Sequence, residues 1–286
     1  MTGFDLVAVV DWSASSAPPR VRPQANAIWI GLASAGQVVT RYHASRHAAE
    51  LALNLMIDAA LLQNQRLLIG FDFPFGYPDG FAAHLTGRPD ATAVWHWLDR
   101  HIVDGPDNRN NRCEVADRIN QSFGLAGPFW GRPESQPLAH LPARKTVDYP
   151  RLQLSERRRV EQIIPRAQPV WKLYTTGAAG GQSLTGLPVI HRLSQRAGVA
   201  VWPFAPPTQI TLAEVYPALL APAVNAAMTP DAIKDEVQVR LLASALHSLG
   251  QTGALDAMLS DPPPEVRSEE GWILGAGHAA SLLAAL

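Results

Sequence analysis

The sequence contains little cysteine and almost no net charge. Its 286 residues include a single cysteine, Cys113, which excludes an intrachain disulfide and a zinc site built from several thiolates. The formal charge is −1, from 24 Lys and Arg against 25 Asp and Glu, which argues against a protein that coats nucleic acid or an anionic membrane through bulk electrostatics. Any anion-binding surface is therefore expected to be local.

Targeting and membrane signals are also lacking. The N-terminal residues 1–5 have neither the basic region nor the apolar region of a signal peptide, and no apolar run reaches the roughly 18 residues needed to span a bilayer. We therefore expect a cytoplasmic protein with no membrane partner. The sequence does not indicate an oligomeric state.

Apolar residues, by contrast, are plentiful. They make up 47% of the chain against 17% charged residues, which is the balance of a well-buried globule. We find no internal repeat. Residues 1–286 are therefore expected to form a single domain.

Three short apolar runs are typical of strands buried on both faces, and each contains or precedes an acidic residue. Residues 6–10 precede Asp11, residues 67–71 precede Asp72, and residues 209–216 include Glu214. Two further extended segments, 27–33 and 38–43, flank small residues that suit a tight turn, which predicts a β-hairpin.

Helices are predicted in three places. Residues 46–63 contain no Gly or Pro and carry leucines on one face, and a second helix is expected over residues 188–196. The third is expected to begin at Thr229-Pro230 and to end at Gly250, because Thr is a good N-cap and Pro suits the first helical position. In this third helix Asp235 falls on the apolar face. A carboxylate facing a core is costly to ionise unless a base or a cation accompanies it.

The middle of the chain has no long, clean periodicity. Residues 75–165 show short helical patterns near 91–101 and 112–121, separated by loop signals. We interpret this segment as an insertion within the domain.

The order of these elements resembles that of the ribonuclease H-like fold. More closely, the chain resembles a predicted-nuclease family that is known as a domain of unknown function with this fold. The motifs that carry the resemblance are Val9-Val10-Asp11-Trp12-Ser13, Gly70-Phe71-Asp72-Phe73-Pro74, Gly177 to Gly186, Glu214-Val215-Tyr216-Pro217, Lys234-Asp235 and Glu270-Gly271-Trp272. The resemblance implies an α/β fold, with a ribonuclease H-like mixed sheet flanked by helices and a large central insertion.

The resemblance also implies a metal-dependent nuclease. Its carboxylates would hold Mg²⁺ or Mn²⁺ for phosphodiester hydrolysis, with a nucleic acid or a nucleotide-like molecule as substrate and partner. Asp11 would be the central ligand, and Asp72, Glu214 and Asp235 would complete the catalytic and metal-binding set. Hard divalent cations prefer such oxygen ligands. Taken singly, each acid also has an ordinary explanation as a turn former or a helix cap.

Candidate substrate-binding residues lie mainly in a Gly-rich stretch, Thr175 to Gly186, whose backbone amides precede a helix and are placed to cradle a phosphate. His191, farther along, is a candidate proton carrier. The full set of candidates is Ser13, Lys172, Thr176, Gly180, Gly181, Ser183 and His191.

Positive charge gathers in one segment. Residues 144–172 contain eight basic and three acidic side chains, which suggests either a footprint for a phosphate backbone or a solvated helix face.

Two other functions compete with the nuclease. Asp11 is followed by hydroxyl residues, as in ATP-dependent phosphotransferases of the actin-like branch, although Trp12 stands where a glycine would let the backbone approach a phosphate. The third possibility is a non-catalytic binding protein within a biosynthetic pathway. Metal binding separates it from the two enzymes, and ATP turnover separates the phosphotransferase from the nuclease.

Overall fold

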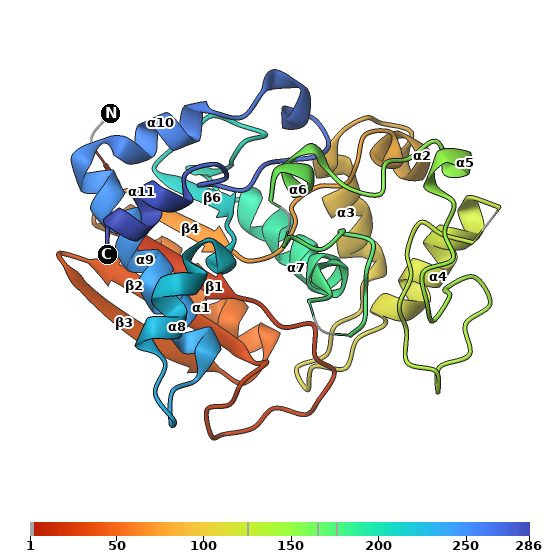
Figure 1. The fold of residues 1–286 in the computed structure, drawn as a ribbon, viewed down its shortest axis with the longest axis horizontal. Helices are drawn as coiled ribbons and strands as arrows, with labels where there is room; N and C mark the ends of the chain where they lie inside the picture. Colours follow the sequence, from red (N-terminus) through yellow and green to blue (C-terminus); the bar gives the residue numbers. More distant parts are fainter. Residues whose placement is uncertain (1–2, 125, 165, 176) are drawn as a thin grey trace.

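The computed structural model describes residues 3–286 except 125, 165 and 176, and its centre is a mixed six-stranded sheet. The strand order is β3-β2-β1-β4-β6-β5 (Figure 1). β2 pairs antiparallel with β1 and β3, whereas β1, β4, β6 and β5 run parallel. The strands are β1 Leu6–Asp11, β2 Ile28–Ser34, β3 Gln37–His43, β4 Leu67–Phe71, β5 Val199–Val201 and β6 Ile210–Glu214. The expected hairpin and the three buried strands are confirmed, and β5 is an additional short strand.

The parallel register brings the acidic ends of neighbouring strands together. Val10 on β1 lies beside Phe71 on β4. Asp11 follows Val10 and Asp72 follows Phe71, so the two acids meet at the same edge of the sheet. The backbone N–H of Asp72 donates to the carbonyl of Val10 at 3.2 Å, which extends the pairing past the end of β4.

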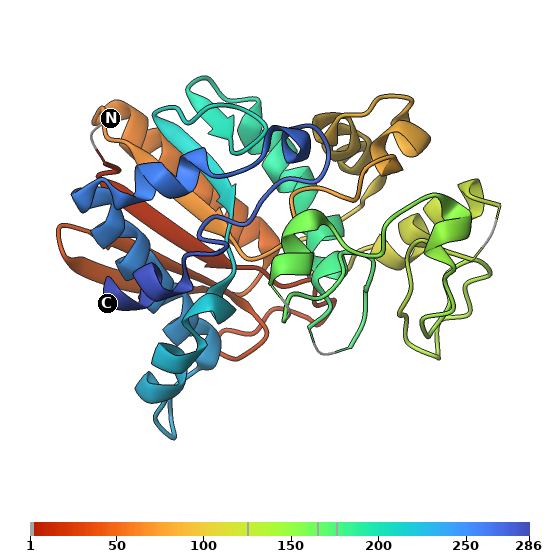
Figure 2. The same cartoon turned by 45° about the horizontal axis from the view of Figure 1, so that its top comes forward.

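Helices cover both faces of the sheet (Figures 1 and 2). Alternate residues of β1 point to opposite faces of the sheet, because side chains alternate along a strand. Ala8 and Val10 share one apolar cluster with α1 (Arg46–Leu62) and α7 (Ala179–Ser194), whereas Val7 and Val9 pack with α9 (Lys234–Thr252) on the other face. The protein is therefore an α/β fold in which helices flank a mixed sheet.

The segment between β4 and α7 lies to one side of the sheet (Figures 1 and 2). It holds α2 Phe81–Thr86, α3 Ala91–His101, α4 Arg112–Ser122, α5 Tyr149–Leu152 and α6 Arg159–Ile163. The remaining elements are η1 Pro217–Leu220, α8 Ala221–Ala227, α10 Ala254–Ser260, η2 Pro264–Arg267 and α11 Ala279–Ala284. Helices with the length and apolar surface needed to cross a bilayer are absent from the described residues.

Two helix starts differ from the prediction. α7 begins at Ala179 rather than at Pro188, which lies inside the helix. α9 begins at Lys234 rather than at Thr229-Pro230, because residues 229–232 form a separate turn closed by a bond from Ala232 N–H to the Thr229 carbonyl. α9 ends at Thr252, and Gly253 follows it in the left-handed conformation.

α9 crosses the sheet at a glycine of β2. A Cβ atom on Gly31 would lie 2.7 Å from the carbonyl oxygen of Val239 on α9, closer than van der Waals contact allows. We expect Gly31→Ala to reduce the free energy of unfolding by about 1–3 kcal/mol, because one of two packed backbones must shift. Urea unfolding measures the loss.

Gly250→Ala, on α9 itself, is the matched control for this prediction. Its added methyl would meet the Phe4 backbone nitrogen at an ordinary 3.6 Å, so the variant should be neutral or slightly more stable than the wild type. A Gly31→Ala protein as stable as Gly250→Ala would contradict the close approach of α9 to β2.

Candidate functional site

Asp11 ends the central strand β1, and the residue after it fixes the backbone. Trp12 is buried, its backbone N–H donates to Asp72 Oδ1 at 2.7 Å, and its indole Nε1–H donates to Thr185 Oγ1 on α7 at 3.2 Å. Its carbonyl accepts a hydrogen bond from Gln182 Nε2. The chain that carries Asp11 is therefore tied both to the end of β4 and to α7.

Asp72 is held from two sides. Besides the Trp12 N–H on Oδ1, Gln182 Nε2 donates to Oδ2 at 3.3 Å. Each carboxylate oxygen has two lone pairs, so both oxygens keep acceptor capacity for a further ligand.

Asp235 approaches from the first turn of α9. Its Oδ2 accepts the backbone N–H of Asn26 at 2.7 Å, and the carbonyl of Asn26 accepts the Ser13 hydroxyl at 2.7 Å. Asn26, at φ 56, therefore joins the loop after Asp11 to the start of α9.

The three carboxylates repel one another. Burial, together with the negative charges of Asp72 and Asp235, raises the pKa of Asp11 well above its ordinary value. Burial raises the pKa of Asp72 to about 7 and Asp235 adds to the rise, although the hydrogen bonds from Trp12 and Gln182 oppose it. Within the described part of the chain, no Lys, Arg or His forms an ion pair with any of the three.

This donor set suits a hard divalent cation, which would supply the missing positive charge. In the described ranges, no group of three or more His, Cys, Asp or Glu side chains is assembled to hold a metal by itself. Mg²⁺ is commonly held by one or two carboxylates while it keeps several waters. Asp11 and Asp72, on adjacent strand ends, fit that mode of binding.

A buried arginine supports the loop that follows Asp11. Arg46, at the start of α1, forms a two-pronged ion pair with Asp104 and donates to the carbonyls of Ser13 and Ser15. It also donates to the carbonyl of Asn108 at 2.7 Å. Its charge is neutralised by Asp104, so its role is to hold the loop in place.

Glu214, predicted as a fourth metal ligand, has a different partner. Arg158 donates to both of its oxygens, at 2.6 and 2.8 Å, and the Phe75 N–H donates to Oε2 at 3.1 Å. Arg158 also pairs with Glu161, so Glu214 belongs to a buried cluster of one guanidinium and two carboxylates. The structure thus brings together three of the four predicted acids and directs the fourth into an ion pair.

Several predicted phosphate-binding groups are used in other contacts. The N–H of Gly180 donates to the Lys172 carbonyl, and Ser183 is fully buried, with its hydroxyl bonded to the Pro74 carbonyl at 2.9 Å. His191 contacts His96 on α3. It follows Gln182 by nine residues, which places it on the opposite face of α7.

Two of the predicted substrate-binding residues stay close to the carboxylates. Ser13 lies in the loop after Asp11, and a Cβ atom on Gly181 would lie 3.4 Å from Ala14 in the same loop. Lys172 lies near Trp130, with Nζ 6.0 Å from the ring centre. Thr176 lies outside the described residues.

The basic segment 144–172 is not a continuous phosphate-binding face. Arg158 is buried, Lys145 pairs with Glu156 at 2.7 Å, and Arg159 pairs with Asp79 at 2.9 Å. Much of its positive charge is therefore used within the protein.

The raised pKa of Asp72 predicts a pH-dependent stability change. The pKa of Asp72 is about 7 in the folded protein and near 3.8 in the unfolded chain, so folding favours the protonated carboxyl. The stability that Asp72 contributes is therefore fully present below about pH 4 and is lost as the pH rises through 7. In EDTA, we compare the unfolding free energy of Asp72→Asn with that of the wild type at pH 5 and at pH 8. We expect this difference to shift in favour of the variant by roughly 2 kcal/mol from pH 5 to pH 8, after discounting for solvent screening. Urea titrations at the two pH values measure it.

A change in packing at residue 72 that does not depend on pH contributes equally at both pH values, so it cancels when the two stability differences are compared. Asp231→Asn, in the exposed turn before α9, is the control and should show no such gain. An equal stability difference at pH 5 and pH 8 would contradict the raised pKa.

Sequence reasoning did not identify Gln182, Asn26 or Arg46 as parts of this site. Gln182 falls within the Gly-rich stretch, which was the only local signal for it. Comparison with protein-family models, curated proteins and solved structures finds no match to this chain.

Proposed function

We propose that this protein is a divalent-metal-dependent phosphodiester hydrolase that acts on a nucleic acid or a nucleotide-like substrate. One observation carries the proposal: Asp11 and Asp72 end adjacent parallel strands, Asp235 is joined to the loop after Asp11 through Asn26, and no described cationic side chain forms an ion pair with any of the three. Burying such a cluster is costly for the fold, so a bound cation explains why it is there.

The arrangement of strands supports a ribonuclease H-like fold. β1 is central, an antiparallel hairpin adjoins it on one side, and parallel strands adjoin it on the other. Asp11 and Asp72 then occupy the carboxyl ends of neighbouring parallel strands, which is where ligands of open α/β sheets are commonly bound.

In the proposed mechanism Asp11 and Asp72 would hold Mg²⁺ or Mn²⁺, and Asp235 would add negative charge beside them. When bound, such an ion would supply the activation of a water and the stabilisation of charge on the phosphate oxygens. Gln182 and the N–H of Trp12 orient Asp72, and Arg46 fixes the loop that carries Ser13. These contacts keep the carboxylates in place before substrate arrives.

The competing phosphotransferase function is less well supported. It needs backbone amides after Asp11 that are open to a nucleotide phosphate. The N–H of Trp12 is already donated to Asp72, and the indole fills the space that a glycine would leave. This observation favours the hydrolase.

Calorimetric titration of Mn²⁺ at pH 8 tests the proposal directly. Wild-type protein and the Asp231→Asn control should bind the ion, and Asp11→Asn should show no saturable binding, because it removes one of the two carboxylates at adjacent strand ends that would hold the ion. Mn²⁺ binding that survives in Asp11→Asn, or none in the wild type, would remove the basis for the metal-dependent hydrolase.

A further inference from the structure

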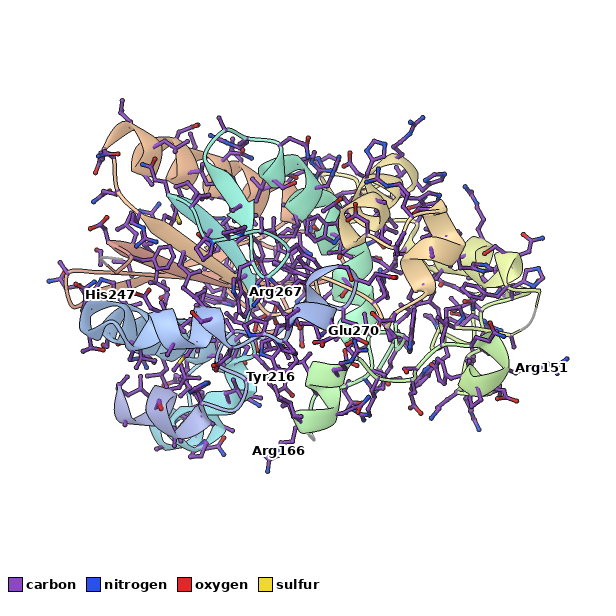
Figure 3. The ribbon with its side chains drawn as sticks, turned by 90° about the horizontal axis from the view of Figure 1, so that it is seen from above. Arg151, Arg166, Tyr216, His247, Arg267 and Glu270 are labelled. Atoms are coloured by element: carbon purple, nitrogen blue, oxygen red, sulfur yellow. The ribbon has the colours of Figure 1, made fainter. Side chains whose placement is uncertain are left out.

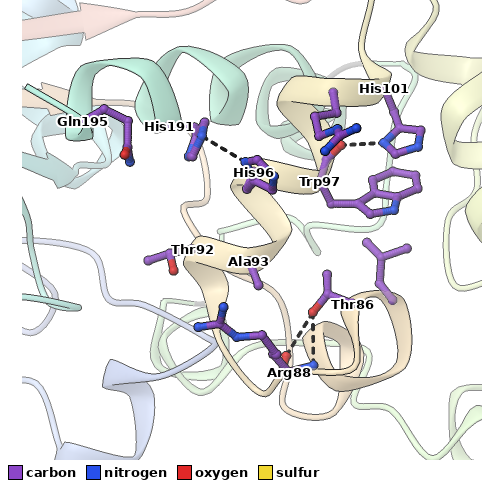
Figure 4. A pocket seen from close by; sticks show the side chains of 11 residues that line it. Thr86, Arg88, Thr92, Ala93, His96, Trp97, His101, His191 and Gln195 are labelled. Carbon is purple, nitrogen blue, oxygen red and sulfur yellow. Dashed lines mark hydrogen bonds between the residues drawn. The ribbon is translucent and has the colours of Figure 1, made fainter.

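A cavity lies away from the carboxylates, where α3 packs against α7 (Figure 4). It has a volume of about 630 Å³ and is lined by residues of α2, α3 and α7 and of the turn between α2 and α3. His191 lies on its α7 side, about 13 Å along that helix from Gln182 and on the opposite face. The cavity is therefore separate from the proposed metal site.

The lining is basic. It includes Arg88, Arg100 and three histidines, and it includes no acidic side chain. Of the nearby acids, Asp90 accepts one N–H of Arg88 at 2.9 Å and caps α3, and Asp99 pairs with Arg192. Arg100 is exposed and forms no ion pair with any residue that the structure describes.

The histidine pair adds an oriented donor. His96 Nδ1 lies 3.3 Å from His191 Nε2, and His191 Nδ1 is buried without a hydrogen-bond partner in the described chain. A buried N–H without an acceptor is rarer than an unpaired acceptor, so the buried Nδ1 of His191 is the nitrogen without a proton. The ring proton is then on Nε2, and this N–H donates a hydrogen bond to His96 Nδ1. His96 Nδ1 is then the acceptor, which leaves the ring proton of His96 on Nε2, and because the side chain is exposed this N–H is open to a ligand.

An aromatic wall completes the cavity. The rings of Trp97 and His101 are stacked, with centres 3.8 Å apart and planes 14° from parallel, and both line the cavity (Figure 4). A flat ring of a ligand packs well against such a surface.

We propose that this cavity binds a small molecule that joins a phosphomonoester to a flat ring. Guanidinium groups match phosphate oxygens with paired N–H donors, and His96 Nε2–H supplies a further donor. Charge complementarity selects an anion, and the Trp97–His101 wall selects a ring.

Adenosine monophosphate is a suitable probe, with adenosine and inorganic phosphate as its two fragments. In calorimetric titrations at pH 7.5 in EDTA, we expect saturable binding of the monophosphate and at least tenfold weaker binding of either fragment. The Arg88→Gln/Arg100→Gln variant should bind it at least tenfold more weakly. The EDTA excludes a metal bridge on the histidines or on the carboxylates.

Arg20→Gln/Arg22→Gln is the matched control, because it removes the same charge from exposed positions elsewhere and should bind like the wild type. Asp11→Asn should also bind normally, which separates this proposal from the hydrolase. Adenosine binding as tight as that of the monophosphate, unchanged affinity in the Arg88/Arg100 variant, or no saturable binding to the wild type would overturn it.

Discussion

Asp11→Asn is expected to reduce Mn²⁺-dependent hydrolysis of a generic phosphodiester, bis-p-nitrophenyl phosphate, by about a thousandfold. Metal stabilisation of a phosphoryl transition state is worth several kcal/mol, and each 1.4 kcal/mol changes the rate roughly tenfold. Asp11 ends the central strand between β2 and β4, and its pKa responds to both other carboxylates, so its loss removes the centre of the cluster.

The effect should be confined to the cluster. Asp231→Asn should retain wild-type hydrolysis, because residue 231 is exposed and lies outside the three carboxylates. The rate is measured as release of p-nitrophenol at saturating Mn²⁺, with circular dichroism to show that each variant is folded. A folded Asp11→Asn protein with activity within tenfold of the wild type would contradict the proposed role of Asp11.

Arg158→Met is expected to reduce the free energy of unfolding by about 3–5 kcal/mol, the usual cost of leaving buried charges without their partner. Arg158 is 1% exposed and bonds both Glu214 and Glu161, and it also donates to the Glu270 carbonyl at 2.9 Å. Glu270 lies where the C-terminal segment meets the region that contains α6 (Figure 3). The variant therefore leaves two buried carboxylates uncompensated.

Arg151→Met is the matched control for this change. Arg151 lies at the outer end of the molecule (Figure 3) and is exposed, so its loss should alter stability by less than 0.5 kcal/mol or so. Adding Glu214→Leu to Arg158→Met should recover part of the loss, because one uncompensated charge is then removed. A loss below about 1 kcal/mol for Arg158→Met in urea titrations would show that the ion pair is not an essential part of the fold.

Local patterns were sufficient for much of the sheet. The buried run before Asp11 and the one before Asp72 are strands, and the helix over residues 46–62 agrees with the absence of Gly and Pro there. Since the carboxyl ends of adjacent parallel strands meet, the proximity of Asp11 and Asp72 was also foreseeable.

Glu214 shows where local pattern fails. The apolar run before it resembles the run before Asp72, yet its partner Arg158 lies 56 residues away in a segment without clear periodicity. A sequence pattern reports which face of a strand is buried, but not which distant side chain will neutralise an acid at its end.

The predicted start of α7 at Pro188 was wrong for a related reason, because the glycines before it lie inside the helix. Gly180 and Gly186 disfavour a helix locally, but a Cβ atom on Gly186 would lie 2.3 Å from the ring of Phe73, and one on Gly180 would lie 2.0 Å from the Val170 carbonyl. Close packing against these groups requires glycine and outweighs the cost of about 1 kcal/mol for each in a helix.

The buried Arg158 also sets an order for folding during synthesis. Its acceptors lie on residues 161, 214 and 270, so a ribosome must add more than a hundred residues after Arg158 before all of them exist. Until residue 214 leaves the exit tunnel, Glu161 is the one carboxylate of this set with which the Arg158 guanidinium can pair. The region around α6 therefore completes its packing late in translation, after the strands that precede it have been made.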